Sequence, residues 1–133
     1  MLRHLLLCGA LAAAGSPIVI QAHHSYAAYL QERKTPVAGT LERYTVANPH
    51  STLVVRTSDG TAVTVEWRGL LQLQRSGFRP EMLAVGDRIV ITGSPARDPQ
   101  DHRLSLITEI RRPADGWRWQ PGGITLAATG AGR

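Results

Sequence analysis

The strongest constraint on the fold is a pair of alternating segments, residues 52–57 and 62–68, joined by a tight-turn sequence. From Val63 to Trp67 apolar residues alternate with polar ones, a period of two that is typical of a strand with one buried face. The dipeptide Asp59-Gly60 suits a turn that needs a positive φ. These features predict a β-hairpin.

The flanking sequence extends this hairpin into a small β domain. Further strands are expected at residues 37–46, 88–92 and 103–111, and a short Leu-rich helix is expected at residues 69–76. Three strands, a helix and two strands are the order of an OB-fold, so we predict an all-β, five-stranded OB-like Greek-key barrel. The short helix between the third and fourth strands would plug one end. A generic five-stranded β-sandwich is the alternative.

The N-terminus has the layout of a secretory signal peptide. Arg3 and His4 precede an apolar run, Leu5 to Ala14, and Pro17 interrupts it before it reaches the roughly 20 residues of a membrane span. Cleavage after Ala22 is preferred and cleavage after Ala14 is the competitor; a buried N-terminal helix is the other interpretation. The expected organisation is a signal peptide at 1–22, an arm at 23–36, a barrel at 37–119 and a flexible tail at 120–133.

Export limits which cross-links and partners the composition allows. The chain has 133 residues, a formal charge of +5 and one Cys, which lies in the predicted signal peptide at position 8. Disulfides and cysteine-based zinc sites are therefore excluded from the mature protein. The basic excess would favour a nucleic-acid partner, but a periplasmic or secreted protein does not meet one, so we expect none and expect no membrane span.

Several short motifs occur in a characteristic order. They are His23-His24-Ser25-Tyr26, Asn48-Pro49-His50, Val85-Gly86-Asp87, Gly93-Ser94-Pro95-Ala96 and Arg112-Pro113-Ala114-Asp115-Gly116. In this order the sequence resembles the DUF6152 family of small exported bacterial proteins of uncharacterised function. The resemblance covers about residues 23–117. The resemblance implies that the protein is exported and has a barrel-like fold. It implies no particular reaction.

The histidines are the candidate metal ligands. Cleavage after Ala22 would leave His23 as the N-terminal residue, whose α-amine and ring Nδ1 can chelate one ion. His50 would add a third nitrogen, and His24 competes for that position. Three nitrogens suit Cu(II), so a copper ion is the expected cofactor if these residues bind metal. The alternative is that His50 caps a turn and His24 hydrogen-bonds a barrel end.

An enzyme is not expected. The sequence has no G-x-S-x-G elbow, P-loop or G-x-G-x-x-G motif. Glu66 should point to the face opposite Trp67, and Glu42 and Glu109 lie on different predicted strands. Nothing in the sequence brings two carboxylates to the roughly 5 Å separation of a retaining glycosidase. A glycan or small-ligand enzyme that uses Glu66 or Glu42 therefore ranks last.

The segment Trp117-Arg118-Trp119 is the second candidate site. Two tryptophans around an arginine can form a docking edge for an envelope protein or a glycan. Equally, one tryptophan can pack back across the barrel mouth. The leading hypothesis is a periplasmic, non-enzymatic binding or accessory module whose site is the His23/His50 end, and the alternative is a structural module that docks through this Trp/Arg surface.

Overall fold

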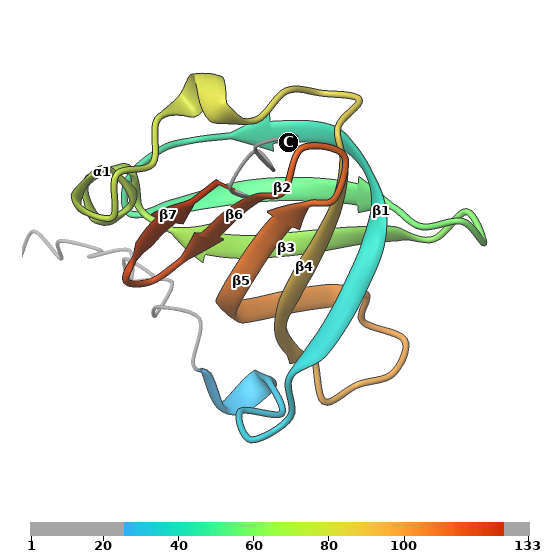
Figure 1. Cartoon of the computed structure of the whole chain (residues 1–133). Coiled ribbons are helices and arrows are strands. Elements are labelled where there is room, and N and C mark those ends of the chain that lie inside the picture. The colour runs from blue at the N-terminus through green and yellow to red at the C-terminus, as the bar shows by residue number, and fades with distance from the viewer. Residues whose placement is uncertain (1–25, 127–133) are drawn as a thin grey trace, which may run out of the picture.

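The strands follow one another in the order that the sequence predicts, and a short helix separates the third from the fourth (Figure 1). The computed structural model describes residues 26–126, so the predicted signal peptide, His23 and His24 lie outside the described residues. The elements are η1 (Tyr26–Ala28), β1 (Thr35–Thr45), β2 (His50–Arg56), β3 (Ala62–Arg68), α1 (Leu70–Arg75), η2 (Pro80–Met82), β4 (Arg88–Pro95), β5 (Arg103–Arg112), β6 (Trp117–Gln120) and β7 (Gly123–Thr125).

Five of these strands close into a mixed barrel. The strand β1 pairs antiparallel with β2 and with β4, β2 pairs with β3, and β4 pairs with β5. A short parallel ladder between β3 and β5, Thr64 with Arg103 and Val65 with Leu104, joins the two ends. The resulting strand circuit, β1-β2-β3-β5-β4, is that of an OB-like barrel and confirms the predicted fold class.

The β2–β3 hairpin forms as the local sequence predicts. Gly60 has a φ of 87°, the left-handed conformation that favours glycine, and the Thr57 N–H donates to the Thr61 carbonyl at 2.9 Å. The hairpin register then pairs every residue of β2 with one of β3, from Arg56 opposite Ala62 to His50 opposite Arg68. This register determines which side chains share a face at the far end of the hairpin.

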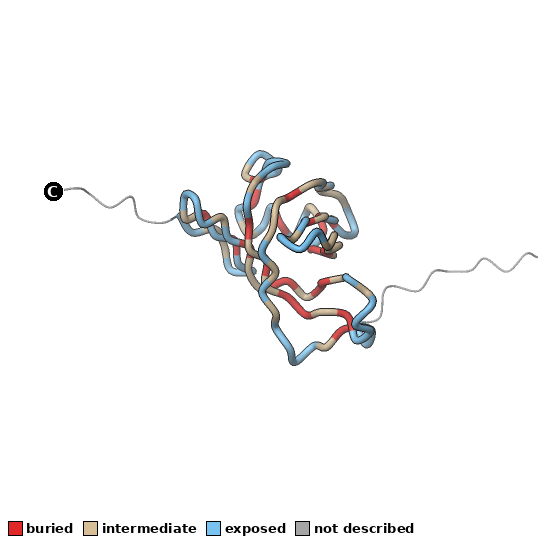
Figure 2. Tube along the Cα trace, turned by 90° about the vertical axis from the view of Figure 1, so that its right-hand side faces the viewer, coloured by how far each residue is buried: buried red, intermediate tan, exposed pale blue. Residues whose placement is uncertain are grey.

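The interior contains an aromatic cluster at the end of the barrel next to α1. The Trp67 ring packs edge-on against Phe78, with centroids 4.8 Å apart, and against Trp119, with centroids 4.9 Å apart. Leu73 of α1 is fully buried beside them, so this helix covers the barrel end as predicted. Figure 2 shows buried positions alternating with exposed ones along the strands, as one buried face requires.

The barrel boundaries differ from the prediction at both ends. The strand β1 begins at Thr35, two residues before the predicted start, and Pro36 lies within it. At the other end, β6 and β7 form a hairpin in which Trp119 pairs with Ile124. The first residues of the predicted flexible tail are therefore strand, because Ile124 packs against the buried core.

Candidate functional site

The barrel seam between β3 and β5 is closed over only part of its length. The parallel ladder ends at Val65 and Leu104, although both strands continue. Beyond that point β5 bulges. Thr92 and Ser94 of β4 pair with Glu109 and Ser105, so four residues of β5 span the distance of two on β4. The bulge lies where the β3–β5 ladder has ended, so these two strands are unpaired along this part of the seam.

Two backbone features accompany the bulge. Leu106 adopts a φ of 50°, a left-handed conformation that is strained for a branched side chain. Gly93 lies under the bulge: a Cβ there would lie 2.6 Å from Ile107 Cδ1 and 2.7 Å from the Ser105 carbonyl oxygen. A glycine is thus required on β4 so that β5 can fold over it.

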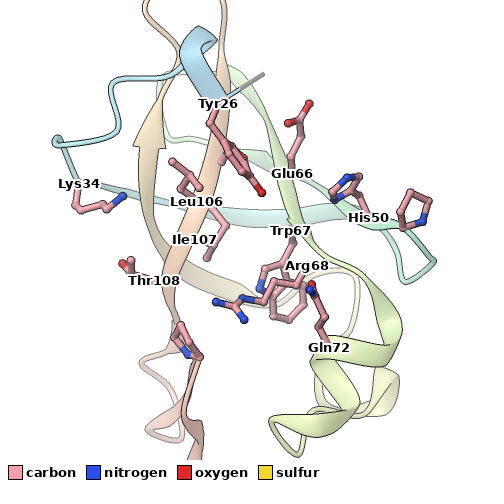
Figure 3. Close-up of a pocket in the computed structure, with 13 residues that line it drawn as sticks. Tyr26, Lys34, His50, Glu66, Trp67, Arg68, Gln72, Leu106, Ile107 and Thr108 are labelled. Carbon is pink, nitrogen blue, oxygen red and sulfur yellow. The ribbon is translucent and has the colours of Figure 1, made fainter. Parts of the chain in front are cut away.

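The opened seam is a cleft of about 730 Å³. It runs along the barrel between η1 and α1, which lie at opposite ends of the fold (Figures 1 and 3). The lining residues come from the arm, β2, β3, α1, the β5 bulge and the β6–β7 turn: Tyr26, Lys34, Pro49, His50, Glu66, Trp67, Arg68, Gln72, Ser105, Leu106, Ile107, Thr108 and Pro121.

His50 is exposed at the start of β2 and faces this cleft. It pairs with Arg68, and Glu66 lies one diagonal step away on the same outer face of the hairpin. The imidazole makes no hydrogen bond to any residue within 26–126. The turn is instead held by its neighbour, because Asn48 Oδ1 accepts the Leu71 N–H at 3.2 Å. The alternative in which His50 caps its own turn therefore has no support in the described contacts.

Glu66 belongs to a polar network on the cleft wall. Its Oε2 accepts the Tyr29 hydroxyl at 2.8 Å, and Arg103 Nη1 lies 3.7 Å from its Oε1. Burial of the Tyr29 hydroxyl, and then its bond to Glu66, raise the pKa of Tyr29 well above its ordinary value. Arg103 in turn donates a hydrogen bond from Nη2 to Asp101 Oδ2 at 2.5 Å. This bond raises the pKa of Arg103 and lowers that of Asp101.

The alternation of β3 predicts Glu66 on the face opposite Trp67, and the structure confirms this, since Trp67 is buried and Glu66 is on the outside. The position of Glu66 beside His50 was not predicted. The signal was present in the predicted hairpin, because a turn at Asp59-Gly60 sets the register of β2 on β3 and so brings residue 50 opposite residue 68.

The arm brings the described N-terminal end of the chain to the same cleft. Leu30 donates its N–H to the Pro95 carbonyl at 2.9 Å, and Arg97 donates its N–H to the Ala28 carbonyl at 2.9 Å. These bonds add the arm to the end of β4, where Tyr29 bridges to Ala96. As a result, Tyr26 lines the same cleft as Glu66 and His50 (Figure 3).

The predicted Trp/Arg surface is largely interior. Trp117 is 2% exposed and Trp119 is fully buried, while Arg118 between them is exposed and lies 3.4 Å from Glu109. The tryptophans therefore offer no aromatic docking edge, and the packing alternative is what the structure shows. The physical reason is the β6–β7 hairpin, whose alternation turns both indoles toward the core.

The residues within 26–126 include no group of three His, Cys, Asp or Glu side chains close enough to hold a metal ion. No helix in this described part of the chain is long and apolar enough to cross a membrane.

A small OB-like barrel with a cleft at its open seam is the class of protein that this geometry defines. Residues 10–105 match the model of a family of unknown function, DUF6152. That match covers more than half of the chain, so the chain belongs to the DUF6152 family. No curated protein matches the sequence. No function is known for this family, so it assigns no role to the cleft.

Proposed function

We propose that this protein is an exported, non-enzymatic binding module that binds Cu(II) at the His50 side of the seam cleft. The observation that carries the proposal is that His50 and Tyr26 line the same cleft. His23 and His24 precede Tyr26 by three and two residues. At about 3.5 Å per residue, the chain allows both histidines to lie within about 10 Å of that tyrosine.

The ligand chemistry follows from export. Cleavage after Ala22 would give His23 a free α-amine, so its amine and ring would supply two nitrogens and His50 a third. His24 is the competitor for the third position. These ligands are neutral near pH 7, and a divalent ion with tetragonal nitrogen preference, Cu(II), fits such a set better than Mg²⁺ or Ca²⁺.

A binding role is favoured over catalysis by the carboxylates of the cleft. Glu66 is the only carboxylate among the described lining residues, and it already accepts the Tyr29 hydroxyl and faces Arg103. Paired-carboxylate hydrolysis needs a second such group within about 5 to 10 Å across the substrate.

The test is calorimetric titration of Cu(II) into protein that begins at His23, and into a matched version with one additional Gly before it. We expect the extended version to bind at least about tenfold more weakly, because the added residue removes the amine–imidazole chelate. His50→Ala should weaken binding as well. His102→Ala is the matched control, because His102 is exposed and does not line the cleft. Equal affinity in the native and extended versions would overturn the amine chelate.

His24 is separated from His50 by a further variant. Loss of affinity in His24→Ala with none in His50→Ala would move the third ligand to the arm. Mass spectrometry of the protein recovered from the periplasm tests the compartment and the cleavage position together, and an N-terminus other than His23 would remove the basis of the site.

A further inference from the structure

We infer that the open seam also binds a small organic carboxylate, held by the Trp67 indole N–H and the Arg68 guanidinium. This inference concerns a ligand other than the metal, and it is tested without metal.

The first observation is an unpaired donor in the cleft wall. Trp67 lines the cleft and is 2% exposed, and its Nε1, which is itself buried beneath the cleft surface, has no acceptor among the described residues. A buried N–H without an acceptor is costly, so such groups are rare in proteins. By contrast, Trp119 Nε1 donates to Ser76 Oγ at 2.8 Å.

The donor is held in place by its neighbours. The edge-on contacts of Trp67 with Phe78 and Trp119, at 4.8 and 4.9 Å, restrain rotation of the indole. The N–H is therefore fixed in position before any ligand arrives. A preorganised donor gains affinity because no side-chain freedom is lost when the acceptor binds.

The second observation is the charge around the opening. The Arg68 guanidinium reaches across the cleft in Figure 3, and it forms no ion pair with a carboxylate of residues 26–126. Lys34, on the opposite wall, donates to Ser94 Oγ at 2.7 Å and to the Gln31 carbonyl at 3.0 Å, both neutral acceptors. The one carboxylate of the wall, Glu66, has Arg103 at 3.7 Å. The described cleft thus has an excess of positive charge, which favours an anion.

The third observation is the nature of the remaining wall. Leu106, Ile107, Pro49 and Pro121 supply apolar surface beside the donors. A free phosphate or sulfate has no apolar part to bury there, whereas a carboxylate with a compact hydrocarbon body has both an anionic and an apolar end. The guanidinium fork also matches a carboxylate with two parallel hydrogen bonds.

The strained bulge supports a ligand role for the same place. The left-handed Leu106 lies in the wall of the cleft, and backbone strain of this kind is concentrated at functional sites. The bulge also lies in the part of β5 that follows the last residue paired with β3, so the strained residue and the unpaired seam occupy the same place.

The experiment follows the tryptophan indole N–H resonances by two-dimensional NMR, with protein stripped of metal by a chelator and then desalted. The probes are acetate, butyrate and benzoate, with butanol and benzyl alcohol as neutral counterparts and inorganic phosphate as the anion without an apolar body. The Trp67 resonance is assigned through its contacts to the Phe78 and Trp119 rings and, independently, through Trp67→Phe.

We expect a saturable shift of the Trp67 indole resonance with butyrate or benzoate, at concentrations of about 1 to 10 mM, and none with the alcohols. The Trp117 indole, which also lacks a described acceptor but does not line the cleft, is the internal control and should not shift. Arg68→Gln should weaken binding about tenfold or more, whereas Arg75→Gln, on the exposed side of α1, should leave it unchanged.

The inference would be overturned by the absence of a saturable shift with any of the carboxylates, by an equal shift with the alcohols, or by an equal shift in Arg68→Gln. A shift with phosphate as large as that with benzoate would show a general anion site and would overturn the carboxylate assignment. Because no metal is present, failure here leaves the copper proposal standing, and failure of the copper titration leaves this result standing.

Discussion

The Tyr29 hydroxyl donates a 2.8 Å hydrogen bond to Glu66 Oε2, and this bond joins the arm to β3 across 37 residues of sequence. Tyr29 is fully buried, and the Arg103 guanidinium lies 5.8 Å from its ring centroid. The contact fixes the arm that carries Tyr26 and at the same time fixes the carboxylate that faces the cleft. It therefore couples the position of the N-terminal segment to the wall of the candidate site.

Tyr29→Phe removes the hydroxyl from this network. We expect the free energy of unfolding to fall by about 1–3 kcal/mol, because the half-buried Glu66 carboxylate loses a donor. Urea denaturation measures the effect. Tyr26→Phe is the matched control, since Tyr26 is about half exposed, and should change stability by no more than about 0.5 kcal/mol. Equal stabilities for the two variants would show that the hydroxyl contributes nothing.

Ser76→Ala tests the hydrogen bond between the β6–β7 hairpin and the C-terminal end of α1. Ser76 Oγ accepts the indole N–H of fully buried Trp119 at 2.8 Å, so the variant leaves that donor without an acceptor. The expected loss is about 1–3 kcal/mol in thermal or urea unfolding. Ser58→Ala, in the exposed hairpin turn, should be close to neutral. A neutral Ser76→Ala would mean that the indole finds another acceptor.

Gly93→Ala tests the bulge at the open seam. The added Cβ would lie 2.7 Å from the Ser105 carbonyl oxygen, which belongs to the backbone and yields only if β5 shifts. We expect a loss of about 1–3 kcal/mol and displaced amide resonances for Leu106 and Ile107. Gly122→Ala is the control, because a Cβ there meets nothing within 4 Å. Unchanged resonances at the bulge would contradict the packing argument.

Asp59 gives the hairpin turn a defined acid dependence. Its carboxylate accepts hydrogen bonds from the Thr57 hydroxyl and from the Thr61 N–H, and these lower the pKa of Asp59 from 3.8 to about 2. A depressed folded-state pKa contributes stability above the unfolded value, and this contribution is lost as the pH falls from about 4 through about 2.

Asp59→Asn should therefore be less stable than the wild type near pH 5, and the difference should shrink toward pH 2. Urea midpoints across this range measure it. Thr57→Val removes the hydroxyl that donates to Asp59, so the pKa of Asp59 should be lowered less. The stability of this variant should therefore change less between about pH 4 and about pH 2 than that of the wild type. A stability difference that is independent of pH would contradict the charge-based explanation.

Local patterns predicted much of the barrel. The hairpin at Asp59-Gly60, the alternation of β3 and the Leu-rich helix are properties of short segments, and the structure has all three. The docking surface at Trp117 and Trp119 was wrong, and the packing alternative was right. The sequence left both open because nothing nearby shows that β6 turns the two indoles toward Phe78 and Trp67.

Only some residues of the candidate site could be identified from the sequence. His50 was singled out from its motif, and the hairpin register was sufficient to place it opposite Arg68. Lys34, Leu106 and the Trp67 indole could not be added, because they reach the cleft from the arm, from a bulge and from the core. A bulge is set by the fit between β4 and β5, and no local periodicity marks it.

The sequence by itself determined the five barrel strands, their main turn, the order of these elements and the family, because each depends on neighbouring residues or on ordered motifs. The tertiary structure alone decided that the seam opens, that Glu66 is tied to Tyr29, and that the tryptophans are interior. These outcomes depend on where β3 and β5 separate. The two strands pair through only four residues, and β5 then continues into the strained bulge at Leu106. Both features require strands that are far apart in the sequence to have come together, so local sequence patterns do not show them.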